Sequence, residues 1–227
     1  MNVKLYTFLK IIFLNLFKSR NFYKYILKNS KNSNSQVYQD LFVSYYSNLK
    51  KRGNFIEIGG GNGKTISNTW LLEKKYKWNG FICEPNHELH KFILSCRNAK
   101  LIKSGIDKYC GKKIFYSSND LYKSSFCKTS EVIQKKNKIL KVISLNYLFK
   151  KFNLKNKIDY ISIDTEGNEY EILKSFNFKK NNVKFFTVEH NFNRVNRHNI
   201  FKLFKKNGYK RIFSNISYMD DWYLKIS

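Results

Sequence analysis

The feature that most constrains this chain is a short apolar strand that runs directly into a cluster of glycines. Residues 54–63 read Asn-Phe-Ile-Glu-Ile-Gly-Gly-Gly-Asn-Gly. A second apolar segment ends on Glu84, about 20 residues after the loop, where dinucleotide folds place an acid that binds the ribose. A strand, a glycine turn, a helix and a second strand form the βαβ unit of a parallel sheet. A nucleotide site is therefore expected at the carboxyl edge of that sheet.

The spacing of these glycines excludes two well-known phosphate-binding loops. A Walker loop needs a Gly five positions before Gly63-Lys64-Thr65, and Ile58 stands there. A dinucleotide-binding loop needs its third Gly at position 64, which holds Lys64. A ligand without a phosphate fits the loop better.

The residues Glu57, Gly59, Gly61 and Gly63 give the acid-x-Gly-x-Gly-x-Gly spacing of S-adenosylmethionine (SAM) sites. SAM carries an ammonium and a sulfonium, so a carboxylate before the first Gly is favourable, and glycines allow close approach of the ligand. Glu84 is placed to accept hydrogen bonds from both ribose hydroxyls, each worth roughly 1.5–3 kcal/mol when the acceptor is charged. A plain glycine turn followed by a surface acid is the alternative interpretation.

Length and charge limit the choice of partner. At 227 residues and 42% apolar content, the chain suits one α/β domain with a substantial core. The net charge of +27 would ordinarily suggest nucleic acid or an anionic membrane. Only six of the 43 basic residues are Arg, however, and Lys is spread along the whole chain, whereas proteins that read nucleic acid concentrate Arg. A solvated basic surface is preferred over a nucleic-acid partner.

The cysteines give no indication of a metal or of disulfides. Cys83, Cys96, Cys110 and Cys127 are widely spaced and form no C-x-x-C pair. No metal site is predicted, and the expected location is the reducing cytoplasm, with membrane association as an option.

The first 28 residues differ in character from the rest. Six apolar residues follow the spacing of one helix face, with lysines around them: Leu5, Phe8, Leu9, Ile12, Phe13 and Leu16. The uncharged stretch 11–17 is far shorter than the roughly 18 residues that a membrane span needs, and no signal cleavage site is visible. Contact with an anionic membrane and docking on the domain both stay open. Residues 29–35 are expected to link this helix to a domain over 36–227.

Strand and helix patterns alternate after residue 35. Strands are expected near 54–58, 80–83, 100–103, 158–163, 183–189, 209–213 and 221–226, and helices near 65–76, 86–97, 144–151, 168–176 and 196–206. This order predicts an α/β, Rossmann-like fold of the class I methyltransferase type, with a seven-stranded mostly parallel sheet, helices on both faces and a C-terminal antiparallel hairpin. Residues 105–137 suggest a short hairpin near 112–116 and a polar run over 117–130, either a lid or disordered.

Taken together, these motifs resemble the FkbM family of SAM-dependent methyltransferases. The resemblance rests on Gln39-Asp40-Leu41-Phe42, Phe55-Ile56-Glu57-Ile58-Gly59, Ser67-Asn68-Thr69, Glu84-Pro85-Asn86, Ile161-Ser162-Ile163-Asp164-Thr165-Glu166-Gly167 and Val188-Glu189-His190-Asn191. Gly59-Gly60-Gly61 replaces the usual Gly-Ala-Asn, and Glu57 stands where Asp is common; both changes keep the chemistry. The N-terminal helix lies outside the resemblance.

The resemblance implies methyl transfer from SAM to an oxygen, on a hydroxyl of a sugar, a glycan or another small metabolite. Besides the glycine loop, Glu57 and Glu84, it assigns Asn68 to the cofactor site, and Asp107 is a candidate for the adenine amino group, with a turn acid as the alternative. The transfer is an in-line displacement, so the protein mainly has to align donor and acceptor.

A hydroxyl acceptor also benefits from a base at the ends of the fourth and fifth strands. Asp164, Glu166, Glu189 and His190 are the candidates, and the imidazole of His190 has the ordinary pKa nearest neutrality. Structural roles are the alternatives: Glu166 capping the next helix, and Glu189 pairing with a lysine.

Two rival functions stay open. Pro85 is the only proline, so the Asp/Asn-Pro-Pro-Tyr/Phe motif of amino-methylating nucleic-acid enzymes and the Pro-Cys nucleophile of cytosine C5 enzymes are both missing. RNA ribose 2′-O-methylation remains as one alternative. A non-catalytic, membrane-docked binding protein is the other, and the intact Glu57, glycine loop and Glu84 argue against it.

Overall fold

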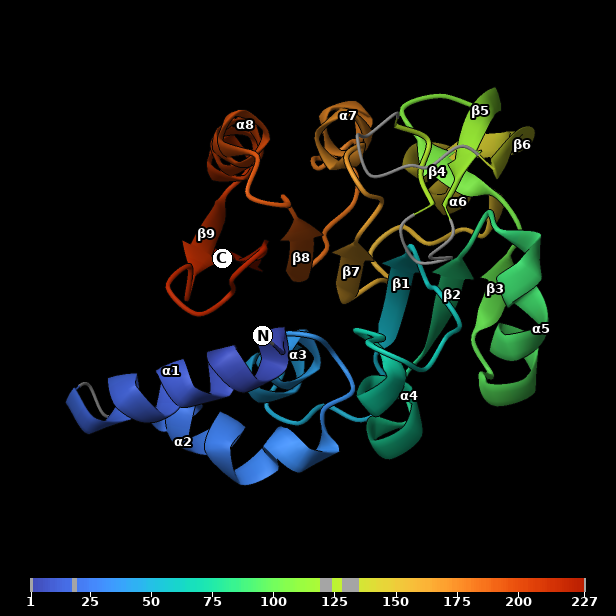
Figure 1. Cartoon of the computed structure of the whole chain (residues 1–227). Coiled ribbons are helices and arrows are strands. Elements are labelled where there is room, and N and C mark those ends of the chain that lie inside the picture. The colour runs from blue at the N-terminus through green and yellow to red at the C-terminus, as the bar shows by residue number, and fades with distance from the viewer. Residues whose placement is uncertain (1, 18–19, 119–123, 128–134, 227) are drawn as a thin grey trace.

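A seven-stranded sheet forms the centre of the computed structural model, which describes residues 2–17, 20–118, 124–127 and 135–226 (Figure 1). Its order is β3-β2-β1-β7-β8-β10-β9. The strands are β1 (Asn54–Ile58), β2 (Asn79–Cys83), β3 (Lys100–Ile102), β7 (Tyr160–Ile163), β8 (Phe185–Glu189), β9 (Tyr209–Ile212) and β10 (Asp220–Lys225). Strand β10 runs antiparallel to β8 and β9, and the other pairings are parallel. The predicted sheet and its C-terminal hairpin are confirmed.

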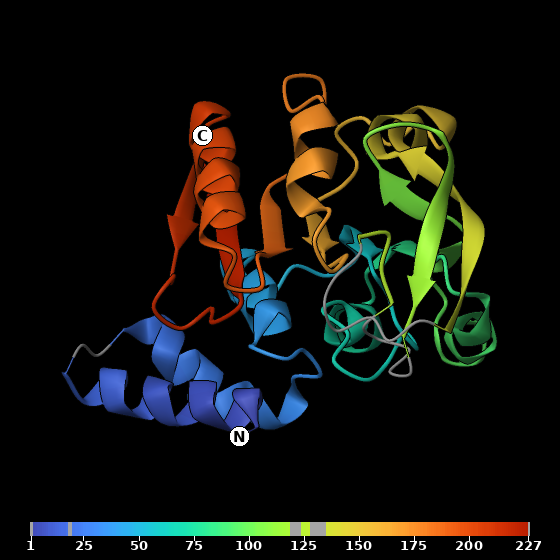
Figure 2. The same cartoon turned by 45° about the horizontal axis from the view of Figure 1, so that its top comes forward.

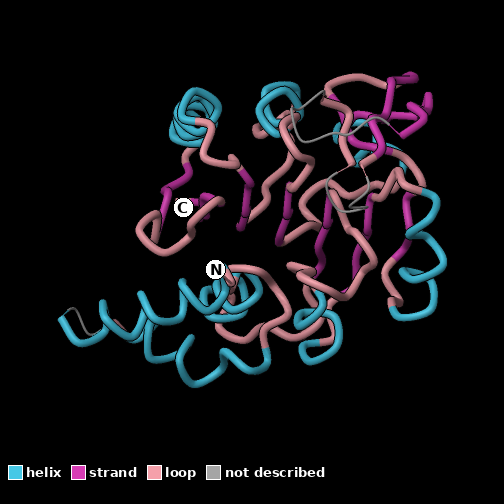
Figure 3. Tube along the Cα trace, in the orientation of Figure 1, coloured by secondary structure: helices cyan, strands magenta, loops and turns pink. Residues whose placement is uncertain are grey.

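Helices cover both faces of this sheet (Figures 1 and 3). One face carries α1 (Val3–Phe17), α2 (Asn21–Asn29), α3 (Gln39–Tyr46) and α4 (Trp70–Tyr76), the other carries α6 (Leu145–Lys151), α7 (Glu169–Ser175) and α8 (Arg194–Lys206), and α5 (His87–Cys96) lies beside β3. Alternate strand residues enter two separate cores, so that Ile161 packs toward α6–α8 while Tyr160 packs toward α1–α4. Burial on both faces is typical of parallel sheets.

The N-terminal region forms two helices instead of one, and α1 and α2 lie side by side in both views (Figures 1 and 2). Helix α2 buries Phe22, Tyr23 and Ile26 in the core. In α1, Thr7 and Ile11 are buried, whereas most of the predicted apolar face, Leu5 and Leu16 included, is exposed. The apolar periodicity is therefore real, but α1 docks through a different face. No helix among the described residues is long and apolar enough to cross a membrane.

The segment 29–35, expected to be a linker, folds against the domain. Residues Ser30–Asn32 form a short 3-10 turn, and Ser33 and Ser35 are buried. Their hydroxyls donate to Asp40 Oδ1 at 2.6 and 2.7 Å, and the Asn34 amide donates to Oδ2 at 3.0 Å. The polar side chains that suggested a linker satisfy a buried carboxylate instead.

A second, three-stranded sheet follows β3, with β4 (Gly105–Asp107), β5 (Gly111–Ser117) and β6 (Lys135–Ser144) in the order β4-β6-β5. The hairpin expected near 112–116 corresponds to β5, which pairs antiparallel with β6, a long strand that the sequence did not predict. Of the polar run 117–130, residues 119–123 and 128–130 lie outside the described residues. In the described part, Phe126 packs on Phe115, with ring centroids 5.0 Å apart.

Candidate functional site

The glycine loop turns over the ends of β1 and β2. The Gly59 amide donates to Cys83 O at 3.0 Å, and Gly59 has a φ of +83°, which favours glycine. A Cβ at position 59 would lie 1.7 Å from the carbonyl oxygen of Asp164, so no side chain fits there. The loop is thereby fixed between β2 and the segment after β7.

Glu57 lies beneath the loop and is surrounded by donors. Its carboxylate accepts hydrogen bonds from the Ser67 hydroxyl at 2.9 and 3.0 Å, the Asn68 amide at 2.7 Å and the Thr69 hydroxyl at 2.6 Å. The Arg97 guanidinium adds an ion pair at 3.3 Å. These contacts also explain why α4 begins later than predicted, because residues 67–69 turn toward Glu57 before the helix starts. A contact between Glu57 and a cofactor ammonium stays a prediction, and the structure adds a role in holding the loop.

Arg97 connects Glu57 to a second acid. Its fully buried guanidinium donates to Glu73 Oε2 at 2.9 Å and to the Gly63 carbonyl at 2.8 Å. Burial raises the pKa of the Glu73 carboxyl, but the charge and hydrogen bond of Arg97 outweigh burial and hold it below its usual value. We call Glu57, Ser67, Thr69, Glu73 and Arg97 the Arg97 network. Gly63, predicted to contact the cofactor, packs on Arg97 and Ile93 instead of lining the cavity described below.

Sequence reasoning missed Arg97, although a signal for it was present. In a chain that uses Lys for nearly all of its positive charge, an Arg marks a place where a planar, multidentate donor is needed.

Glu84 lies at the end of β2, where the sequence predicted it. Its carboxylate accepts from the Gly61 amide at 2.9 Å and the Asn86 amide at 2.8 Å. Burial raises the pKa of Glu84 to about 7, against the effect of these two hydrogen bonds. Each carboxylate oxygen can accept a further bond from a ligand.

A cavity of about 730 Å³ joins the glycine loop to the ends of β7 and β8. Among its lining residues are Glu57, Gly59, Gly60, Gly61, Asn68, Glu84, Ser125, Phe126, Asp164, Glu166 and Glu189. Glu57 and Glu84 therefore share one open space, as a SAM site requires. Ser125 and Phe126 belong to the segment predicted as a lid, and the Ser125 hydroxyl donates to the Glu166 carbonyl at 2.9 Å.

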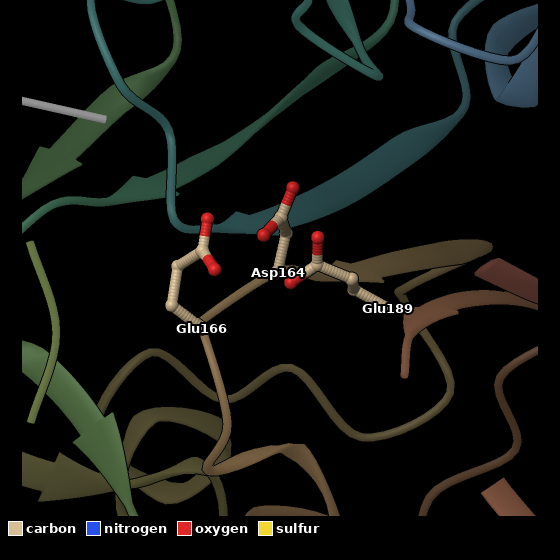
Figure 4. A group of neighbouring side chains, drawn as sticks. All are labelled: Asp164, Glu166 and Glu189. Atoms are coloured by element: carbon tan, nitrogen blue, oxygen red, sulfur yellow. The ribbon is translucent and has the colours of Figure 1, made fainter. Parts of the chain in front are cut away.

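Three carboxylates meet at the far end of this cavity (Figure 4). Asp164 follows β7, Glu189 ends β8, and Glu166 reaches back from a left-handed backbone with a φ of +57°. One oxygen of each lies within 4.8 Å of the others. We call these residues the acidic cluster. The amide of Asn191 donates to Glu166 Oε2 at 2.8 Å, and Glu169, not Glu166, accepts from the amides of Thr165 and Gly167 at the start of α7.

The electrostatics of the acidic cluster favour protons or a bound cation. Burial, and then the charge of Glu166, raises the pKa of Asp164 well above its usual value. Burial, and then the charge of Asp164, raises the pKa of Glu189. Neighbouring carboxylates that are shielded from water cannot all ionise without compensation.

His190 and Asp107 do not line the cavity, contrary to the roles considered for them. His190 follows Glu189 directly, and its Nδ1 accepts from the Phe192 amide at 3.1 Å, while burial lowers its pKa. Asp107 is buried and pairs with Lys113 at 2.7 Å. Neither side chain is placed as a base or an adenine contact in this cavity.

Comparison with known proteins gives one family match. A family model described as the Methyltransferase FkbM domain matches residues 57–211, which include the glycine loop, Glu84 and the acidic cluster. No curated protein matches the sequence.

Several solved structures are similar to this chain at low sequence identity. One is precorrin-6y C5,15-methyltransferase from Geobacter metallireducens GS-15, with 11% identity and a TM-score of 0.45 over 82% of this chain and 87% of that one. Another is MtNAS in complex with MTA and tNA, with 9% identity and a TM-score of 0.43 over 100% and 71%. A third is a Haemonchus contortus phosphoethanolamine N-methyltransferase 2 bound to phosphomonomethylethanolamine and S-adenosylhomocysteine, with 10% identity and a TM-score of 0.40 over 91% and 47%.

Proposed function

The chain belongs to the FkbM family of SAM-dependent methyltransferases, and we propose that its methyl acceptor is a hydroxyl oxygen on a sugar, a glycan or another small metabolite. The observation that carries this proposal is the single cavity with the glycine loop and Glu84 at one end and the acidic cluster at the other. A hydroxyl acceptor suits the acidic end, because carboxylates accept hydrogen bonds from hydroxyl groups.

The residues at the first end fit SAM. The cavity volume of about 730 Å³ lies within the range of small-molecule sites, roughly 300–1,000 Å³. Gly59 leaves backbone without a side chain at the cavity wall, and Glu84 keeps acceptor capacity for the ribose hydroxyls. SAM, when bound, supplies a methyl carbon activated by its sulfonium.

The second end would hold the acceptor. A hydroxyl that donates a hydrogen bond to Asp164 or Glu189 has its oxygen fixed, and such fixing supplies much of the rate in a displacement that needs in-line geometry. The described residues Ser125 and Phe126 border the same space and would limit the size of the acceptor. Glu166, Asp164 and Glu189 are therefore proposed as acceptor-site residues, and Glu57, Gly59, Gly61, Asn68 and Glu84 as cofactor-site residues.

The test begins with S-adenosylhomocysteine (SAH) binding to the purified protein by calorimetry. Radiolabelled methyl transfer from SAM to a fractionated cell extract follows, and we expect label in glycans or small polar metabolites, stable to mild alkali as a methyl ether is. Label in RNA would instead favour ribose 2′-O-methylation. A folded protein that does not bind SAH would favour a non-catalytic protein.

Contact with an anionic membrane is a second proposal, favoured by the exposed face of α1. Leu9 is 55% and Leu16 is 76% exposed on this helix, and Lys24 and Lys28 are exposed on the adjacent α2. Apolar side chains with lysines beside them match a bilayer surface that carries negative charge.

Vesicle sedimentation tests this contact. We expect binding to vesicles with phosphatidylserine, weak binding to neutral phosphatidylcholine, and a loss of roughly tenfold or more in Leu9→Ser/Leu16→Ser, because two apolar side chains no longer enter the bilayer. Leu94→Ser, at an exposed leucine of α5, is the control. Equal binding of both variants would refute the proposal.

A further inference from the structure

The acidic cluster has the dimensions of a site for one cation. Strands β7 and β8 pair in parallel with Ile163 opposite Val188, so the next residues, Asp164 and Glu189, end adjacent strands side by side. Figure 4 shows the carboxylates of Asp164, Glu166 and Glu189 directed toward one another. Two oxygens on the same Mg²⁺ or Ca²⁺ ion, at roughly 2.0–2.6 Å from it, lie at most about 5 Å apart. The separations in the cluster, within 4.8 Å, meet that limit.

The protein supplies no cation of its own to two of these acids. Among the described residues, no Lys, Arg or His lies within ion-pair distance of Asp164 or Glu189. Glu189 is only 7% exposed, and its Oε2 accepts no hydrogen bond. A buried carboxylate oxygen without a partner is costly unless a ligand completes it.

Asn68 provides an independent observation on the same wall of the cavity. Its Nδ2 donates to the Ser162 hydroxyl at 2.8 Å, while its buried Oδ1 accepts no hydrogen bond. Alternate residues of a strand share a face, so Ser162 lies on the same side of β7 as Asp164. Amide and carboxylate oxygens are the ligands that hard divalent cations prefer.

We propose that Asp164, Glu166 and Glu189 bind one divalent cation of the Mg²⁺ type, and that this cation holds the acceptor oxygen. The inference rests on the proposed methyl transfer to a hydroxyl. A cation of this type keeps open positions for water or substrate. The acceptor would be a hydroxyl with a second oxygen on the adjacent carbon, as in a sugar, because both oxygens can then occupy such positions.

The chemistry balances without a further reactant. A hydroxyl on the cation loses its proton more readily, and that proton passes to water. The new O–C bond forms as the C–S bond breaks, and the sulfur keeps the electron pair and becomes the neutral thioether of SAH.

Manganese binding tests the cation site directly. The full-length protein, freed of metal by a chelator and then desalted, is titrated with MnCl2, and free Mn²⁺ is followed by electron paramagnetic resonance. We expect one site in the wild type and at least tenfold weaker binding in both Glu189→Gln and Asp164→Asn. Glu171→Gln removes an exposed acid of α7 that pairs with Lys108, and it should bind Mn²⁺ like the wild type.

SAH calorimetry on the same samples separates this inference from the proposed function. Wild type that binds SAH but no Mn²⁺ would overturn the cation site and leave the methyltransferase intact, whereas absence of SAH binding would count against the function itself. Equal Mn²⁺ affinity in wild type and both cluster variants would mean an adventitious ion only and would also overturn the site. Circular dichroism checks that each variant is folded. If either Glu189→Gln or Asp164→Asn does not fold, the other variant still tests the site.

Discussion

Two groups of acids, one buried and one partly buried, lie near the carboxyl edge of the same sheet, and the protein surrounds them differently. In the Arg97 network, Glu57 receives donors from two hydroxyls, one backbone amide and a guanidinium. In the acidic cluster, Glu189 is almost as buried, yet its Oε2 accepts no hydrogen bond, and the charges of Asp164 and Glu166 add to burial in raising its pKa.

The difference separates acids that are fully hydrogen-bonded by protein donors from Glu189, whose Oε2 accepts no hydrogen bond. A buried charge with all its partners in place is strongly destabilised when one partner is removed. Glu189, which lies beside other acids, should lose little when it is neutralised and can gain from a bound cation. Glu57 and Glu189 both belong to sequence motifs near the carboxyl ends of strands, so their contacts and not their positions distinguish them.

The largest effect is expected from Arg97→Met, which leaves Glu57 and Glu73 buried without their cation. Removing one partner of a buried ion pair costs about 3–5 kcal/mol of the free energy of unfolding. Urea denaturation measures this loss, and Arg52→Met, at an exposed arginine, is the control. A loss below about 1 kcal/mol would contradict the structural role of the Arg97 network.

Replacing Glu57 and Glu189 by Gln, one at a time, compares directly how much each acid contributes to stability. Glu57→Gln should lower the free energy of unfolding by about 2–3 kcal/mol, because its new amide group faces donors and the ion pair is gone. Glu189→Gln should cost less than about 0.5 kcal/mol or stabilise, because the oxygen it replaces accepts no hydrogen bond. Denaturation of the metal-free proteins measures both values, and similar losses would remove the distinction.

Glu84→Gln tests the acid that we propose binds the ribose of the cofactor. The neutral amide accepts ribose hydroxyls less well, and a loss of about 1.5–2 kcal/mol corresponds to roughly 10–30-fold weaker SAH binding. Calorimetry measures the affinity. Glu88→Gln, one turn further along at an exposed acid that pairs with Lys138, should leave it unchanged. Unaltered binding in Glu84→Gln would place the ribose elsewhere.

The smallest effect is a pH dependence of SAH binding. Burial raises the pKa of Glu84 to about 7 in the ligand-free protein, and the ionised form is the better acceptor. Affinity should rise by up to about tenfold between about pH 6 and 8, and Glu84→Gln should lack this rise. The stability contribution has the opposite sign: because the pKa is raised, it is full below the ordinary pKa of Glu84 and is lost as the pH rises through 7.

Local patterns predicted the sheet and one end of the site. The strand, glycine loop and acid of residues 54–84 stand in an order that any chain of this fold must keep. The Arg97 network was missed because its members come from four separate segments, and no local pattern relates Arg97 to Glu57.

Of the four residues predicted for the second end of the site, three line the cavity and His190 does not. Asp164, Glu166 and Glu189 were expected at the strand ends and line the cavity together. His190 follows the last residue of β8, and whether it reaches the cavity depends on the path of the chain after the strand, which the sequence pattern does not give. The polar composition of residues 29–35 likewise could not show that the hydroxyls of Ser33 and Ser35 donate hydrogen bonds to Asp40, because these contacts depend on tertiary packing.

The aromatic contacts of α2 join segments that lie about 190 residues apart in the sequence. Phe22 packs on Phe213 and Trp222, with ring centroids 4.5 and 6.2 Å apart, and Asn215 donates to the Tyr23 hydroxyl. During synthesis α2 leaves the ribosome before the segment with Phe213, Asn215 and Trp222 has been made. The contacts of α2 with these residues therefore form late in folding. This face of the protein can therefore be completed only after β10 has been translated, and until then Phe22 and Tyr23 lack the partners that bury them in the folded protein.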